Sequence, residues 1–297
     1  MFAVIVACFL AGILLRRGAP ATHGWVGPLD RVVLWVLLPA LIVAKLPGAE
    51  LGAAIAVPVA VAWGTLFVAW ATVLGLSHRL GWSRTTTGAL LMMASFGNTS
   101  FLGLGAVEAL LGRDHLPSAL AFDQLGNFLA LATIGTLITS RWGHGEAGVR
   151  DVARRVLTFP PFLALLVAVV LRHWPLPDGA TDALGSVGRL VSPVAMFTIG
   201  LRFRWPQGAG IWRRASACLA IKMGLMPAVA LAAAIVAGGL DDPAWRASVL
   251  EAGMPPMVTA SLMASQAGLD EELSTFVVGA GLLVAVVTLP LLRLAIG

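Results

Sequence analysis

The sequence is poor in charged residues, and this scarcity excludes most soluble proteins. Of 297 residues only 12% are charged, 58% are hydrophobic, and the mean hydropathy is +0.89. A soluble domain has about 25% charged residues. Apolar runs of about 17 to 25 residues, long enough to cross a bilayer, recur along the whole chain and leave no room for a soluble enzyme module. We therefore expect one integral membrane domain.

The chain also has few cysteines and none of the common enzyme motifs. Cys8 and Cys218 both fall inside apolar segments, so neither a disulfide nor a metal site is expected. The motifs HExxH, GxSxG, GxxxxGK[ST] and CxxC do not occur. The five histidines lie in connections, without a second ligand at metal-binding spacing. We expect no enzymatic activity and no cofactor.

Turn residues and charges divide the chain into ten predicted spans: 2–17, 29–46, 53–77, 85–111, 117–140, 157–174, 184–203, 215–237, 243–267 and 273–296. Thirteen basic residues fall in odd-numbered connections, against six in the even connections and at the C-terminal end. By the positive-inside rule the odd connections are cytoplasmic and both termini lie outside. The net charge of +5 is therefore assigned to topology and to anionic lipid, and no nucleic-acid partner is expected.

A basic connector at 141–156 divides the chain into halves 1–140 and 157–297, with five predicted spans each. Because five is odd, the second half must lie inverted relative to the first, as in many secondary transporters. The second span of each half carries a mid-span proline, Pro39 or Pro193. The sequence thus predicts an all-α membrane protein of two inverted five-helix repeats.

The fourth and ninth spans carry helix breaks at equivalent places: Gly97-Asn98 in the fourth and Gly253-Met254-Pro255-Pro256 in the ninth. In hydrocarbon each unpaired backbone group costs several kcal/mol, so such breaks belong at a protected polar cavity. We expect the two breaks to cross near the midplane, where half-helix N-termini suit a carboxylate. The alternative is that both breaks merely kink packed helices. The predicted substrate-binding residues at the crossing are Asn98, Thr99, Ser100, Pro255 and Pro256.

Other polar residues fall within predicted spans. Lys222 lies on the order of 10 Å deep in the eighth span, too deep for easy snorkelling, and is a candidate substrate ligand. Glu251 can bind a proton or cation, or pair with Lys222. Asp123 and Asn127 lie one turn apart on the fifth span; Asn127 is a candidate substrate ligand, and Asp123 a candidate proton or cation site.

An ordered set of segments resembles the auxin efflux carrier family: VLLPALIVAKL, GNTSFLGLG, EALLG, SPVAMFTIGLRF, EAGMPP and VVTLPLLRL. The resemblance covers essentially the whole chain. It implies ten helices in two inverted repeats, with crossed, broken fourth and ninth helices. It also implies a scaffold from the first two helices of each half and a transport unit from the rest, moving by an elevator mechanism. Plant members often carry Pro-Asn at the first break and a large cytoplasmic loop, both of which are absent here.

The resemblance implies transport of small organic anions, such as malate, malonate or auxin-like acids, across the cell membrane, here a bacterial inner membrane. Expected partners are the anion and the lipid bilayer, with a homodimer left open. The alternatives are a sodium-coupled symporter similar to the bile acid carriers, and a receptor or channel without active transport. Prolines at 255 and 256 remove side-chain oxygens from the second break, which favours proton coupling or uniport over sodium coupling.

Overall fold

The computed structural model describes residues 2–45, 55–143, 160–203 and 208–297, together with the single positions 47, 154, 157, 158, 205 and 206. The connector predicted at 141–156 lies largely outside these residues. Throughout the described ranges every regular element is a helix, and the one isolated β-bridge joins Gly97 to Pro256. The prediction of an all-α protein is confirmed.

Six helices within the described ranges are long and apolar enough to cross a membrane: Val26–Ala44, Ala56–Leu80, Arg113–Trp142, Asp178–Arg202, Ala209–Val236 and Glu271–Ala295. The helix Phe162–Leu171 is also apolar but shorter. The predicted fourth and ninth spans are not among the six because each is interrupted at its centre. The chain is therefore a multi-pass helical membrane protein.

The chain folds into two compact units, each assembled from two separate stretches of sequence. Unit 1 comprises Met1–Ala49 and Glu146–Phe203, and unit 2 comprises Glu50–Gly145 and Arg204–Gly297. Each unit therefore takes one stretch from either side of the predicted connector.

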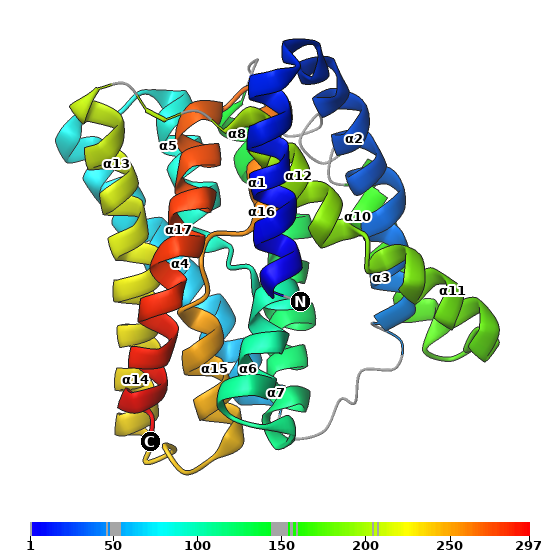
Figure 1. Ribbon diagram of the computed structural model, residues 1–297. Helices are drawn as coiled ribbons and strands as arrows, with labels where there is room; N and C mark the ends of the chain where they lie inside the picture. Colours follow the sequence, from blue (N-terminus) through cyan, green and yellow to red (C-terminus); the bar gives the residue numbers. More distant parts are fainter. Residues whose placement is uncertain are drawn as a thin grey trace. The chain divides into compact units, whose positions relative to one another are not determined.

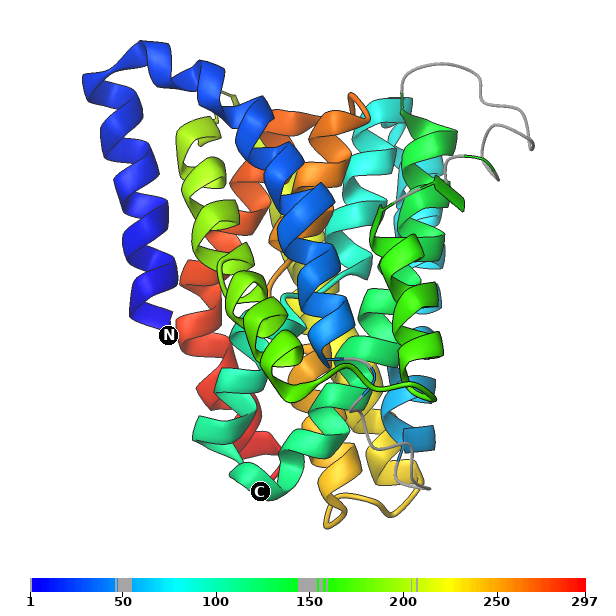
Figure 2. The same cartoon turned by 90° about the vertical axis from the view of Figure 1, so that its right-hand side faces the viewer.

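Unit 1 contains α1, α2, a π-helical segment η2, α3, α10, α11 and α12; their bounds are Phe2–Gly18, Val26–Val32, Val33–Leu37, Leu38–Lys45, Pro160–Leu171, Asp178–Gly188 and Val191–Arg202. Helix α1 packs along α12, as both views show (Figure 1, Figure 2). A Cβ on Gly12 would lie 2.9 Å from the Cα of Gly200, so this packing requires glycine.

Buried polar contacts fix the end of α12 in unit 1. Arg16 Nη1 donates hydrogen bonds to the carbonyls of Leu201, Arg202 and Phe203, at 3.3, 2.9 and 3.1 Å. These carbonyls lie at the C-terminal end of α12, and a cation suits the negative end of the helix dipole. Arg202 in turn forms a buried ion pair with Asp30 on α2.

Unit 2 is built from α4, α5, η4, α6, η5, α7, η6, η7, α8, α13, η8, α14, α15, α16 and α17. In that order their bounds are Ala56–Leu80, Arg84–Ser95, Thr99–Gly103, Leu104–Leu110, Arg113–His115, Leu116–Ala121, Phe122–Phe128, Leu131–Gly135, Thr136–Trp142, Ala209–Ala220, Ile221–Leu225, Met226–Val236, Pro243–Ala252, Val258–Gln266 and Glu271–Ala295. Residues 86–94 of α5 and 258–264 of α16 are all buried. A helix buried on all sides lies at the centre of its unit.

Prolines account for two of the π-helical segments. Pro39 follows η2 and Pro227 follows η8. A proline has no N–H to donate, and its ring collides with the carbonyl of residue i−4, so the preceding turn widens. The predicted mid-span Pro193 has a related effect, because the chain turns at Arg189 and Leu190, between α11 and α12.

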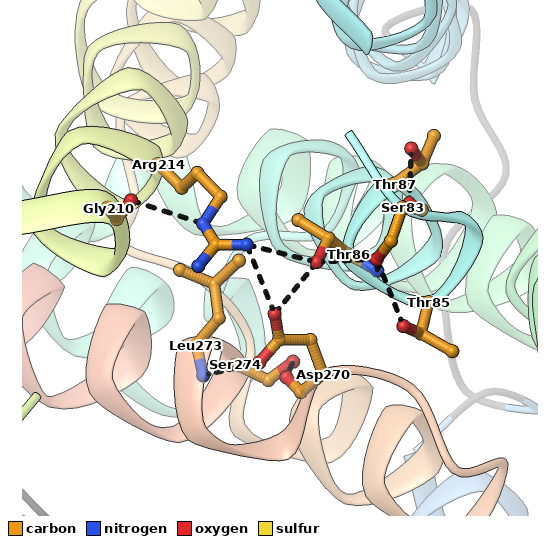
Figure 3. A network of polar contacts seen from close by, with 9 residues as sticks. All are labelled: Ser83, Thr85, Thr86, Thr87, Gly210, Arg214, Asp270, Leu273 and Ser274. Carbon is orange, nitrogen blue, oxygen red and sulfur yellow. Dashed lines mark hydrogen bonds and ion pairs between the residues drawn. The ribbon is translucent and has the colours of Figure 1, made fainter. Parts of the chain in front are cut away.

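A polar network joins the N-termini of α5 and α17 to α13 in unit 2 (Figure 3). Ser83 caps α5 by accepting from the Thr86 N–H, and Asp270 caps α17 by accepting from the Leu273 N–H. Thr86 Oγ1 donates to Asp270 Oδ2 at 2.9 Å and accepts from Arg214 Nη1 at 3.3 Å. One threonine hydroxyl thus connects three helices.

Candidate functional site

Two helices of unit 2 stop and restart in the middle of the buried core. After α5 ends at Ser95, Phe96 is extended and Asn98 has φ −79° and ψ 60°, and the helix resumes at Thr99. The second break runs from Gly253 to Met257, between α15 and α16. Proline biases the residue before it toward extended backbone, which explains why the helix cannot continue into Pro255-Pro256.

The two breaks satisfy each other's backbone groups. The Asn98 N–H donates to the Pro255 carbonyl at 2.8 Å, and the Met257 N–H donates to the Phe96 carbonyl at 2.9 Å. Together these bonds form the antiparallel bridge between Gly97 and Pro256. The non-helical links meet between α5–α6 and α15–α16 (Figure 1). Backbone that would be costly in hydrocarbon is thereby paired inside protein.

Asn127 completes the pairing of the first break. Its amide nitrogen donates to the Gly97 carbonyl at 2.8 Å and to Thr99 Oγ1 at 2.9 Å, while its Oδ1 accepts from the Gly97 N–H at 3.1 Å. The side chain comes from η6, a π-helical segment. Asn127 therefore replaces the helical partners that Gly97 lacks.

Asp123, four residues before Asn127 on η6, accepts a dense set of hydrogen bonds. Thr99 Oγ1 donates to it at 2.5 Å, Ser100 Oγ at 2.6 and 2.7 Å, and Gln124 Nε2 at 2.6 Å. Its side chain is fully buried. The hydroxyls of Thr99 and Ser100 thus face Asp123, and they hold the start of the second half-helix.

Lys222 and Glu251 approach the crossing from η8 and α15. Lys222 Nζ donates to the Ala252 carbonyl at 2.7 Å, at the C-terminus of α15. A Cβ on Gly97 would lie 3.2 Å from the same Nζ, so the ammonium reaches the first break. Glu251 is 0% exposed, and neither of its oxygens receives a hydrogen bond from the described residues. The predicted pair of Lys222 with Glu251 is thus not a direct hydrogen bond.

A cavity of about 10 Å³ lies beside the crossing, enough for about one water molecule. Its lining residues all belong to unit 2: Ala62, Thr65, Leu66, Ser95, Gly97, Phe122, Asn127, Lys222, Met226, Glu251 and Ala252. The cavity thus places an ammonium, a carboxyl and an amide around one small space. Among the described residues no cluster of three or more His, Cys, Asp or Glu side chains could hold a metal ion.

The predicted substrate residues divide between this cavity and the crossing. Asn127 and Lys222 line the cavity. Pro255, Pro256, Thr99 and Ser100 form or flank the crossing. Asn98 does not cap the half-helix with its side chain; its Oδ1 is buried and accepts no hydrogen bond from the described residues.

Sequence reasoning did not single out Ser95. Its hydroxyl is buried, has no hydrogen-bond partner among the described residues, and belongs to a residue lining the cavity. The available signal was its position as the last helical residue before the first break.

Comparison with known proteins gives the family. The profile of the membrane transport protein family matches residues 1–293. An uncharacterized transporter of Methanothermobacter thermautotrophicus is 28% identical over 302 residues, covering 98% of this chain and 95% of its own. An uncharacterized transporter of Methanocaldococcus jannaschii is 22% identical over 182 residues, covering 58% of each chain. The whole-chain match, together with the helical membrane fold, shows that the chain belongs to the membrane transport protein family of the auxin efflux carriers.

Proposed function

We propose that this transporter is a secondary active carrier of small organic anions, of the carboxylate class, and that it works by alternating access. The observation that carries the proposal is the ammonium of Lys222, buried in unit 2 beside two crossed helix breaks. A buried cation at membrane depth is costly unless it is paired, and such residues mark substrate and ion pathways. A carboxylate is the partner that this charge would complement.

The restarted helix adds a second attraction for an anion. Residues 99–110 form one continuous helical stretch that begins at the crossing. Its first N–H groups carry the positive end of the helix dipole, which is worth about 0.3–1 kcal/mol toward an anion at exposed sites and more where water is excluded. Asn98 and Ser95 contribute buried polar atoms that have no hydrogen-bond partner among the described residues.

The cavity of about 10 Å³ is far smaller than the roughly 300 Å³ at which small-molecule pockets begin. A dicarboxylate therefore needs a more open arrangement of these side chains than the one described. A carrier that alternates between closed and open arrangements meets this requirement. We accordingly assign the closed arrangement to a state without bulky substrate.

The composition of the two units supports the same proposal. Unit 1 takes its described helices from the first and the third quarter of the chain, and unit 2 from the remaining stretches. This is the division expected if the chain has ten helices in two inverted repeats, 1–140 and 157–297, with unit 1 as scaffold and unit 2 as carrier. In the proposed topology both termini lie outside the cell membrane.

The test is exchange in proteoliposomes that hold purified protein and unlabelled malate or malonate. We expect the protein to exchange internal anion for labelled external anion without sodium. An absolute requirement for sodium would instead favour the bile-acid-carrier type of symport. Binding without exchange or gradient-driven flux would favour a receptor, and flux without saturation or counter-exchange would favour a channel.

A further inference from the structure

Glu251 is a buried carboxyl to which none of the residues that the structure describes donates a hydrogen bond. It is the second-last residue of α15, and its side chain lines the small cavity together with Lys222. Neither carboxyl oxygen receives a hydrogen bond from the described residues. A Cβ on Gly103 would lie 2.8 Å from the Glu251 carboxyl carbon, so the first restarted helix packs directly against it.

The other buried carboxyl of unit 2 has the opposite environment. Asp123 accepts hydrogen bonds from Thr99, Ser100 and Gln124, which stabilise its ionised form. Glu251 has no such donors within the described ranges, and an ionised carboxylate without them is expensive to bury. The cheaper state of Glu251 in this arrangement is the neutral acid.

The charges around the cavity balance only in that state. Apart from Glu251, the buried charged residues among the described part of unit 2 are Lys222 on η8 and Asp123 on η6. With Glu251 neutral, the one ammonium offsets the one carboxylate of Asp123. The remaining charged or titratable residues on elements packed against α15 lie at helix ends: His78, Arg79, Glu108, Arg113, Asp114, His115, Glu271, Glu272 and Arg293.

We propose that Glu251 carries a proton that crosses the membrane together with the anion. This inference rests on the anion transport proposed above. Neutral Glu251 removes the negative charge that would otherwise line the cavity beside Lys222, so an incoming carboxylate meets the ammonium without that repulsion. Protonation of Glu251 therefore strengthens anion binding by some factor. Because such coupling is reciprocal, the bound anion strengthens proton binding by that same factor. On the release side the O–H bond of Glu251 breaks and the proton passes to water as the anion leaves. A metal cation is disfavoured because Lys222 lines the same cavity.

The first experiment detects the proton without any substrate. Infrared spectra of the purified protein should contain the carbonyl stretch of a protonated carboxylic acid, and carbon-13 labelled glutamate should shift this band. The band should be lost in Glu251→Gln and kept in Glu108→Gln, a matched change at a half-exposed glutamate of α6. Absence of a glutamate band in the unaltered protein at every pH at which it is folded would overturn the proposal, even if the variant fails to fold.

The second experiment measures coupling in proteoliposomes with malate. If one proton crosses with each anion, malate accumulation in the vesicles should rise about tenfold for each pH unit by which the outside is more acidic than the inside. Glu251→Gln should lose this proton-driven accumulation, whereas Glu108→Gln should keep it. Proton-driven accumulation that persists in Glu251→Gln, or exchange by the unaltered protein that is indifferent to the proton gradient, would overturn the proposal.

The two experiments distinguish this inference from the proposed function. If the unaltered protein neither binds nor exchanges malate, malonate or related anions, anion transport is contradicted, while the infrared band still decides whether Glu251 holds a proton. If exchange occurs without any link to protons, anion transport stands and the role of Glu251 is contradicted.

Discussion

At the scale of single residues, Asn127 shows how one side chain stands in for a missing helical turn. Its amide offers a donor and an acceptor in the same geometry as a peptide group, and both are used by Gly97. Lys222 acts differently, because it caps the Ala252 carbonyl and leaves a charge beside the cavity. Asn127 thus supports the backbone of the first break, and Lys222 places a positive charge beside it.

Replacing Asn127 by leucine should destabilise the protein. The change leaves the buried N–H and C=O of Gly97 without their partner, at about 1–3 kcal/mol for each group, so we expect a loss of about 2–6 kcal/mol. Thermal unfolding in detergent, followed by tryptophan fluorescence, measures it. Thr133→Val is the control, because the Thr133 hydroxyl donates to the carbonyls of Leu129 and Ala130, at 2.8 and 3.4 Å, in the preceding turn of its own helical stretch. Equal shifts in the two variants would show that Asn127 is not a specific support.

Replacing Lys222 by methionine should abolish anion exchange while the protein remains monodisperse. Methionine keeps the length of the side chain but removes the charge that a carboxylate requires. The measurement is labelled malate exchange in proteoliposomes. Lys45→Met, at the last position of α3 in unit 1, should change the rate little. A fully active Lys222→Met protein would remove the observation on which the proposed function rests.

At the scale of elements, the distinguishing feature of unit 2 is that the helical stretches α5–α6 and α15–α16 are each interrupted at the centre. Each break interrupts a helix that is otherwise buried. The hydrogen bonds of Asn98 with Pro255 and of Met257 with Phe96 satisfy backbone groups that the breaks leave without helical partners. Between them the half-helices expose ends that a continuous helix would have hidden. Under the proposed function, substrate binding therefore depends on keeping these two helices interrupted.

The double change Gly97→Leu and Asn98→Leu should abolish substrate binding. Leucine favours helix, and a Cβ at position 97 would already lie 3.2 Å from Lys222 Nζ and 3.4 Å from the Met254 Cβ. Malate affinity of detergent-purified protein measures the effect. Gly105→Leu is the matched control, because a Cβ there meets no atom within 4 Å. Unchanged affinity in the double variant would mean that the first break serves packing alone.

The two helix breaks could be predicted from the sequence, but the hydrogen-bond partners of the residues beside them could not. Gly97-Asn98 and Pro255-Pro256 carry local signals, since glycine and proline disfavour helix whatever surrounds them. The donation of Thr99 and Ser100 to Asp123 depends on where η6 lies, which no local pattern encodes. The π-helical segment η6 was also not predicted, because it contains no proline and shifts the helical register without changing the composition.

At the scale of the whole molecule, the open question is the orientation of the chain in the membrane. The charge bias predicts that the connection 78–84 is cytoplasmic and that the connection 238–242 lies outside. Both connections belong to unit 2 and lie fully within the described residues. The orientation of this unit can therefore be tested without reference to the predicted connector.

Single cysteines at His78 and Asp241 should react differently with an impermeant thiol reagent. Both side chains are exposed, at the end of α4 and just before α15. In intact cells, with Cys8 and Cys218 replaced by alanine, Asp241→Cys should be labelled and His78→Cys should be labelled only after lysis. The reverse pattern would invert the topology and place both termini in the cytoplasm.

The bonds that join the two breaks are made by main-chain atoms, and this bears on how such a protein can diversify. Asn98, Pro255, Phe96 and Met257 contribute N–H and C=O groups that nearly any residue would supply. The cavity wall beside them is made by side chains, among which Thr65, Phe122 and Met226 take no part in the crossing. Under the proposed function, substrate selectivity can therefore change through substitutions at the wall while the main-chain bonds of the crossing are kept. A randomised library at these three positions is the natural starting point for selecting carriers of new substrates.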